Sequence, residues 1–118
     1  MNCISTTKNQ AINLCIQNGI ELTRALTFAS LNRGSSRYWA NPNIVLLSEP
    51  CSLLLNDRIN KKLYVMRIPA YSIDVNQLSV RSDNPILIDL QIRYNDMMFV
   101  DARSGYSFKK FLVKTIDY

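Results

Sequence analysis

The sequence predicts an α+β fold with a helical hairpin at the N-terminus, an antiparallel sheet of about four or five strands and an amphipathic helix at the C-terminus. Two patterns support this prediction. Apolar residues recur at helical spacing near both ends of the chain, and they alternate with polar residues in the middle. The chain has 118 residues, 47 % of them hydrophobic, which is enough for one hydrophobic core. We therefore expect residues 1–118 to form a single domain.

The first predicted helix begins after Thr7, whose side chain can cap it, and Gln10 three residues later completes a capping box. Gly19 ends the helix, because glycine adopts the left-handed conformation of a helix C-cap at little cost. The apolar stripe of this helix consists of Ala11, Ile12, Cys15 and Ile16. We expect this stripe to face the core, with Cys15 as a small buried residue.

A second helix is predicted after Gly19, ending near residues 32–34, with an apolar stripe of Leu22, Ala25, Leu26 and Ala29. The two helices and their turn have the spacing of a helix-turn-helix motif. Among the outward residues of the second helix only Arg24 is cationic, whereas a helix that reads DNA usually carries more donors for phosphates and base edges. The pattern therefore favours a structural hairpin over a DNA-reading motif.

Strands are predicted in the middle of the chain. A short apolar run at 44–47 is followed by a hairpin of residues 52–55 and 63–68, which Pro69 ends because proline cannot donate a ladder hydrogen bond. Residues 97–100 form a further short strand. The clearest alternation covers 86–94, with Ile86, Ile88, Leu90, Ile92 and Tyr94 on one face and Leu87, Asp89, Gln91 and Arg93 on the other.

The last predicted element is a helix that Ser107 caps. Its apolar face consists of Phe108, Phe111, Leu112, Thr115 and Ile116, at positions i, i+3, i+4, i+7 and i+8. The three lysines Lys109, Lys110 and Lys114 lie off that face and are available to phosphate or to an acidic partner.

The composition excludes several kinds of chemistry. The chain contains no His, which rules out His-based catalysis and His-dependent zinc sites. Its three cysteines are odd in number and far apart, so they cannot all pair within the chain or form a four-thiolate zinc site. We find no cofactor-binding motif and no metal-ligand spacing, and we expect a protein without cofactor or metal that is not an enzyme.

The sequence also predicts a cytoplasmic location. Free thiols in a small domain are typical of a reducing compartment. Residues 1–10 have no basic segment followed by an apolar one, as a signal peptide would. The longest apolar runs have four residues, too few to cross a membrane.

Positive charge is concentrated at the two ends of the chain. The net charge is +5, of which residues 1–47 carry +3, residues 48–105 carry none and residues 106–118 carry +2. This asymmetry indicates that the ends meet a nucleic acid or an acidic protein surface. A small solvated basic domain without such a partner is the alternative.

Residues 32–39 have the chemistry of a nucleic-acid contact. Arg33 and Arg37 can bind phosphates, the hydroxyls of Ser35 and Ser36 can donate to them, and the ring of Tyr38 or Trp39 can stack on a base. The alternative is a connecting loop in which Trp39 anchors the helices on the sheet.

A weaker pattern is a set of carboxylates similar to that of a magnesium-dependent nuclease. Asp57 lies beside the predicted hairpin, and Asp89, Gln91 and Arg93 share one strand face. The amide carries no charge for a metal ion, and a guanidinium does not easily lose a proton. These residues are therefore expected to be polar positions on the outer side of a strand.

The function favoured by these observations is stoichiometric binding of nucleic acid through the basic N- and C-terminal elements. The alternative is a protein that inhibits or regulates a nucleic-acid-processing enzyme, and a third possibility is a divergent Mg-dependent nuclease. The predicted contact residues are Arg24, Arg33, Ser35, Ser36, Arg37, Tyr38, Trp39, Lys109, Lys110 and Lys114.

Overall fold

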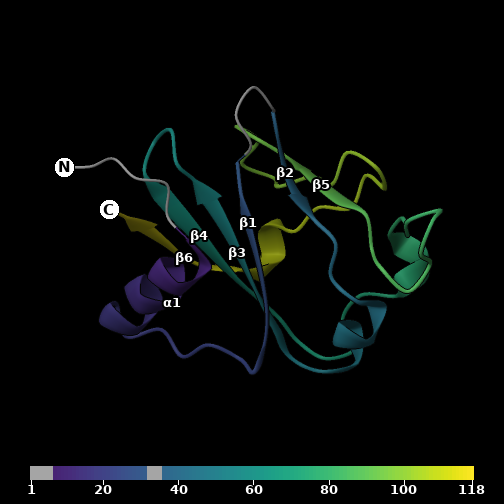
Figure 1. Ribbon diagram of the computed structural model, residues 1–118, viewed down its shortest axis with the longest axis horizontal. Helices are drawn as coiled ribbons and strands as arrows, with labels where there is room; N and C mark the ends of the chain where they lie inside the picture. The colour runs from purple at the N-terminus through teal and green to yellow at the C-terminus, as the bar shows by residue number, and fades with distance from the viewer. Residues whose placement is uncertain (1–6, 32–35) are drawn as a thin grey trace.

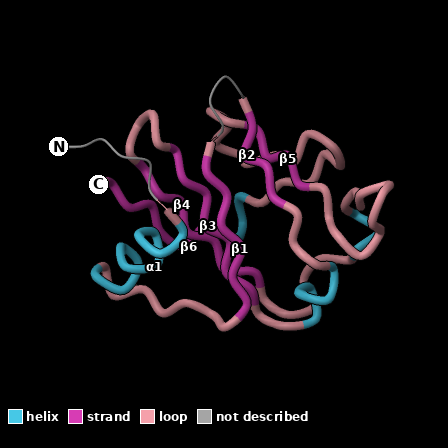
Figure 2. Tube along the Cα trace, viewed as in Figure 1, coloured by secondary structure: helices cyan, strands magenta, loops and turns pink. Residues whose placement is uncertain are grey.

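The computed structural model describes residues 7–31 and 36–118, and in these ranges the fold is mostly β. One α-helix, six strands and three short 3-10 helices occur in the described ranges (Figures 1 and 2). In chain order they are α1 (Lys8–Gln17), β1 (Ala25–Ser30), β2 (Arg37–Ala40), η1 (Ile44–Ser48), β3 (Cys51–Asp57), β4 (Lys62–Ile68), η2 (Val75–Gln77), β5 (Leu90–Arg93), η3 (Lys109–Phe111) and β6 (Leu112–Asp117).

The strands form two sheets. The larger sheet has four strands in the order β1-β3-β4-β6, with β1 parallel to β3 and the other neighbours antiparallel. The smaller sheet consists of β2 and β5, which run antiparallel. A bridge between Leu31 and Tyr38 connects the end of β1 to β2, so the small sheet continues from that edge of the large one (Figure 1). The predicted all-antiparallel sheet is thus a mixed sheet with a second, two-stranded sheet beside it.

The large sheet is covered on both faces. On one face, Ala11 and Cys15 of α1 pack against Leu54 of the central strand β3 and its neighbours in β4 and β6. On the other face, the inner side of β2 and β5 and the chain around η1 and η3 enclose a larger apolar cluster. Every residue of β3 is buried. None of the helices in the described residues is long and apolar enough to span a membrane.

The predicted first helix and the predicted hairpin of two strands are confirmed, but Ile16, which was expected on the buried stripe of the helix with Ala11 and Cys15, is 63 % exposed. The Thr7 hydroxyl accepts from the Gln10 backbone N–H at 3.3 Å, and the Gln10 side chain accepts from the Thr7 N–H at 2.8 Å. Helix α1 ends at Gln17 with Asn18 as its C-cap, and Gly19 follows with φ +72°. The hairpin forms as β3 and β4, and β4 stops directly before Pro69.

The predicted second helix is wrong, and with it the helical hairpin and the helix-turn-helix spacing. Residues 25–30 form β1, whose side chains Leu26 and Phe28 face α1 while Ala25 and Ala29 face the other core. Because apolar residues cover both faces of this strand, the alternation that marks a half-buried strand is missing. The same residues then satisfy a helical spacing.

The predicted C-terminal helix is also wrong. Phe108 and Phe111 are buried around the short 3-10 helix η3, which accounts for their i, i+3 spacing. From Leu112 the chain extends as β6 and pairs with the edge of β4. Val113, Thr115 and Ile116 are β-branched, which favours this strand, and an unpaired β4 edge was available for it.

Two of the predicted strands are absent, and one is shorter. Residues 44–47 lie in η1, whose start Asn43 caps by accepting from the Val45 N–H at 3.0 Å. Residues 97–100 form a turn in which only Val100 makes a bridge. Within 86–94 only β5 is a continuous strand. Ile88, Leu90 and Ile92 are buried as predicted, whereas Ile86, predicted on the same side, is 52 % exposed, and Gln91, predicted on the other side, is 7 % exposed.

Candidate functional site

Alternation along β2 and β5 gives the small sheet an apolar inner side and a polar outer side. Tyr38 pairs with Ile92 and Ala40 with Leu90, and all four are buried. The intervening pairs, Arg37 with Arg93 and Trp39 with Gln91, point the other way. We call this side the outer face and include the neighbouring side chains that border it, so that it consists of Arg37, Trp39, Arg81, Asp83, Asp89, Gln91, Arg93 and Arg103.

Trp39 is the main apolar feature of the outer face. It is 51 % exposed, whereas the adjacent Tyr38 is 2 % exposed. Trp39 therefore does not anchor the fold in the way that one interpretation of the sequence proposed. Tyr38 has that role, and its buried ring is not available for stacking on the outer face.

A chain of polar contacts fixes the side chains around Trp39. Arg37 donates through Nη1 to the Gln91 Oε1 at 2.5 Å, and Gln91 donates through Nε2 to an oxygen of Asp89 at 3.3 Å. The other Asp89 oxygen pairs with Arg103 Nε at 3.4 Å. Two guanidinium groups are thus held at either end of one network.

The buried carboxylate of Asp101 binds both β5 and the turn that carries Arg103, and so helps to position this network. Its Oδ1 accepts from the backbone N–H of Gln91 at 2.8 Å. Its Oδ2 accepts from the Ser104 N–H at 3.2 Å and from the Ser104 hydroxyl at 2.5 Å. These bonds hold the turn at 101–104 against β5, and this turn carries Arg103.

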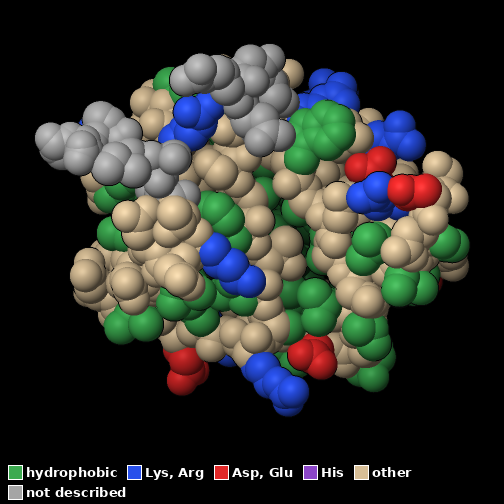
Figure 3. All heavy atoms as spheres, in the orientation of Figure 1, with side chains coloured by type: hydrophobic (Ala, Val, Ile, Leu, Met, Phe, Trp, Pro, Cys, Tyr) green, Lys and Arg blue, Asp and Glu red, His purple; other side chains and the backbone are tan. Residues whose placement is uncertain are grey.

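A polar hollow of about 540 Å³, open to solvent, lies beside Trp39. Its walls include Arg81 and Asp83, which form an ion pair at 2.5 Å. The hydrogen bond between them lowers the pKa of the Asp83 carboxyl and raises the pKa of Arg81, so both groups stay charged at neutral pH. Figure 3 shows charged side chains of both signs around a hydrophobic one at the upper right, where β2 and β5 lie in Figure 1.

The outer face has an excess of positive charge. It carries four guanidinium groups against the two carboxylates of Asp83 and Asp89. Arg37 and Arg93 stand directly opposite each other in the strand pair. Like charges in such a position destabilise strand pairing, so this arrangement favours an anion near the pair.

The residues predicted as contacts are distributed over separate parts of the molecule. Ser36, Arg37 and Trp39 lie at or beside the outer face, while Arg33 and Ser35 lie outside the described residues. Arg24 precedes β1 at the end far from β2. Lys109 and Lys110 lie on η3, and Lys114 lies on β6, at the opposite edge of the large sheet from β1. The described cations among the predicted contacts therefore do not lie together on one surface.

Sequence reasoning missed most of this face. Asp89, Gln91 and Arg93 were recognised as one strand side, but nothing in the sequence indicated that β5 pairs with the strand that carries Trp39. The alternation at 37–40 was the one usable signal. Arg81 and Arg103 lie in irregular segments and had no local signal.

The proposed nuclease-like set is not brought together. Asp57 accepts from the backbone N–H groups of Ile59 and Asn60, both at 3.1 Å, in the turn after β3, whereas Asp89 lies on the outer face. Among the described residues, no three carboxylates or thiols form a group that could hold a metal ion. Burial raises the pKa of the thiols of Cys15 and Cys51, which are therefore poor nucleophiles and ligands at neutral pH.

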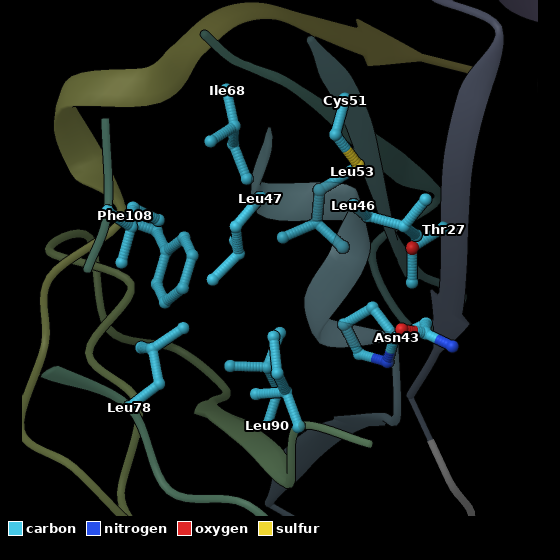
Figure 4. Close-up of a pocket in the computed structure, with 13 residues that line it drawn as sticks. Thr27, Asn43, Leu46, Leu47, Cys51, Leu53, Ile68, Leu78, Leu90 and Phe108 are labelled. Carbon is cyan, nitrogen blue, oxygen red and sulfur yellow. The ribbon is translucent and has the colours of Figure 1, made fainter. Parts of the chain in front are cut away.

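An apolar cavity lies inside the larger core. Figure 4 shows Leu47, Leu78, Leu90 and Phe108 converging on it. Its volume of about 20 Å³ is close to that of a single water, and its walls are almost entirely apolar. This cavity is too small for a cofactor or a nucleotide.

Comparison of the chain with protein-family models, with curated proteins and with solved structures finds no match.

Proposed function

We propose that this protein binds single-stranded nucleic acid stoichiometrically through the outer face of its small sheet. Trp39 stacks on an unpaired base, and the surrounding arginines contact the phosphates on either side. The observation that carries this proposal is the half-exposed Trp39 on a strand with Arg37 and Arg93 paired beside it. Binding to single strands commonly combines an aromatic ring with a groove of positive charge.

Three features of the outer face support this function. Stacking on Trp39 requires a base that is not covered by its neighbours in a duplex, which favours single strands. The open hollow beside Trp39 leaves room for a sugar and a phosphate next to Arg81 and Arg103. The excess positive charge raises the local concentration of a polyanion.

The protein is proposed to bind nucleic acid without cleaving it. Both oxygens of Asp89 are engaged, one by Gln91 and one by Arg103. Asp83 is paired with Arg81. The carboxylates of this face therefore orient guanidinium groups and do not offer a shared metal site.

The sole tryptophan provides the test, because emission from Trp39 reports on the outer face alone. At low salt, a single-stranded oligonucleotide is expected to quench this emission. Arg81→Gln combined with Arg93→Gln should weaken binding and flatten the slope of log affinity against log salt by about 1.4, or about 0.7 for each phosphate contact.

Lys109→Gln combined with Lys114→Gln is the matched control, since it removes the same charge from η3 and from β6, the edge strand of the large sheet opposite β1. Equal weakening by both pairs would contradict a contact on the outer face. If the wild type binds no oligonucleotide at low salt, the nucleic-acid proposal is wrong. An acidic protein surface then becomes the partner to test, as expected for an inhibitor or regulator.

A further inference from the structure

A second hollow lies where the hairpin turn after β3 meets the turn after β5. It has a volume of about 180 Å³ and is lined on the hairpin side by Asp57, Asn60, Lys62 and Tyr64. On the other side are Arg93 and the turn at 95–99, and the buried Tyr38 also lines the hollow. We call this hollow the turn cleft.

The hydroxyl of Tyr38 is a hydrogen-bond donor that a ligand in the turn cleft can use. The residue is 2 % exposed, and no described residue forms a hydrogen bond with its hydroxyl. All fully buried side-chain N and O atoms of the described residues do have partners, so this hydroxyl still reaches open space. That space is the cleft that Tyr38 lines. Burial, and next the nearby Asp57, raise the pKa of this phenol, so it stays protonated and can donate.

Hydrogen-bond acceptors lie in the same wall. The Oδ2 of Asp57 accepts from the side-chain amide of Asn60 at 2.9 Å, and a carboxylate oxygen can accept more than one bond. That Asn60 amide nitrogen also donates to the Tyr94 hydroxyl at 3.0 Å, and the same amide carries Oδ1, a second kind of acceptor on a residue that lines the cleft. A ligand in the cleft thus meets one phenol donor and at least two acceptors.

Aromatic rings form the apolar part of the wall. Tyr64 and Phe99 stand edge to face with their ring centres 5.0 Å apart. Met97 lies beside them and is exposed. Rings next to a few polar groups suit a flat heteroaromatic molecule.

The backbone around the turn cleft is strained. Lys61, Asn95 and Phe99 have φ of +54°, +61° and +50°. These are three of the four non-glycine residues with positive φ in the described ranges, and the fourth, Tyr71, lies elsewhere. For a bulky residue such as Phe99 this conformation is unfavourable, and such strain tends to occur at functional sites.

We propose that the turn cleft binds a single nucleobase, with the attached phosphate on Arg93. The choice of ligand rests on the proposed function, because Arg93 belongs both to the cleft and to the outer face. One strand can therefore place a base in the cleft and its neighbours along Trp39. The edge of a base carries the donors and acceptors that complement Tyr38, Asp57 and Asn60.

Free mononucleotides test the cleft separately from the outer face. Each of the four nucleoside 5′-monophosphates is titrated into 15N-labelled protein up to about 10 mM, a range that detects millimolar affinity by NMR. For at least one base, shifts are expected in the Asn60 side-chain amide and in the backbone amides of Asn95 and Phe99. Tyr38→Phe should weaken this binding about 2- to 10-fold, the effect of losing one hydrogen bond.

Two further variants complete the experiment. Tyr106→Phe removes a phenol outside the cleft, where Tyr106 packs on Phe108, and should leave the affinity unchanged. Arg93→Gln should weaken binding of the monophosphate but not of the corresponding nucleoside. This exposed position also provides a test if Tyr38→Phe does not fold.

The outcomes separate the two proposals. Absence of shifts at the cleft with all four monophosphates, or equal binding by wild type and Tyr38→Phe, overturns the cleft proposal. Quenching of Trp39 by an oligonucleotide then still supports the outer face. Mononucleotide binding at the cleft without oligonucleotide binding supports the cleft and overturns the outer face.

Discussion

The two sheets of this molecule have different roles. In the large sheet, β3 is buried along its whole length, with α1 packed on one side and the larger core on the other. In the small sheet, only the inner side of β2 and β5 joins the core, and Trp39 stands on the outer side among arginines. Stability is therefore concentrated in the large sheet, whereas the outer face of the small sheet can carry charge with little cost to the fold.

This difference explains why an unfavourable pair occurs on the small sheet. Opposing arginines lower the stability of two paired strands. The inner pairs of β2 and β5, Tyr38 with Ile92 and Ala40 with Leu90, bury apolar surface that keeps the strands together. Arg37 and Arg93 can therefore remain side by side on the outer face.

The largest expected effect is a core truncation in the large sheet. Leu54 is 0 % exposed and faces α1. Leu54→Ala should lower the free energy of unfolding by about 2–5 kcal/mol, because it removes buried methyl groups and leaves a cavity. Urea unfolding followed by circular dichroism measures this loss. Ile59→Ala is the control, because this residue lies in the hairpin turn and is 65 % exposed. An equal loss of stability in that variant would contradict the claim that burial of Leu54 causes the effect.

The elements that were predicted correctly are those whose structure depends on interactions between residues close together in the sequence. The capping box at Thr7, the stop at Gly19 and the end of β4 before Pro69 each depend on residues within a few positions of one another. The inward direction of Ile88, Leu90 and Ile92 was also predictable from their alternation with polar residues, although Gln91 between them is buried as well, at 7 % exposed.

The remaining elements depend on contacts between distant residues. Residues 25–30 form a strand because β3 offers a parallel neighbour about 26 positions away along the chain. Residues 112–117 form a strand because β4 has a free edge. For the candidate site, Arg37 and Trp39 were predicted as contact residues. Their pairing with residues 91–93 could not be predicted, because it depends on how two distant segments meet in the sheet.

A second effect on stability, of intermediate size, is expected at Asp101, the buried carboxylate that positions the outer face. Asp101→Asn replaces one accepting oxygen by an NH₂ group in a buried site with backbone and hydroxyl donors. The free energy of unfolding should fall by about 1–3 kcal/mol, because one buried donor loses its partner. The displaced turn should also move Arg103 and weaken oligonucleotide binding, measured by Trp39 quenching. Asp83→Asn, in an exposed ion pair, should leave stability unchanged.

The smallest expected effect has the opposite sign. Arg93→Glu changes a like-charged cross-strand pair with Arg37 into an oppositely charged one, and should raise the free energy of unfolding by about 0.2–1 kcal/mol. The gain should shrink at 1 M salt, where charges are screened beyond about 3 Å. The same substitution should weaken oligonucleotide binding, because it places a carboxylate where a phosphate is proposed to lie.

Arg67→Glu is the matched control for this charge reversal, because Arg67 is exposed on β4 opposite the uncharged Ser52. It should neither stabilise the fold nor weaken binding to the same degree. Urea unfolding at low and high salt, together with Trp39 quenching, measures both quantities on both variants. A loss of stability in Arg93→Glu would show that the opposing arginines stabilise the small sheet. The argument for a bound anion beside Arg37 and Arg93 would then fail, because it depends on their mutual repulsion lowering the stability of the fold.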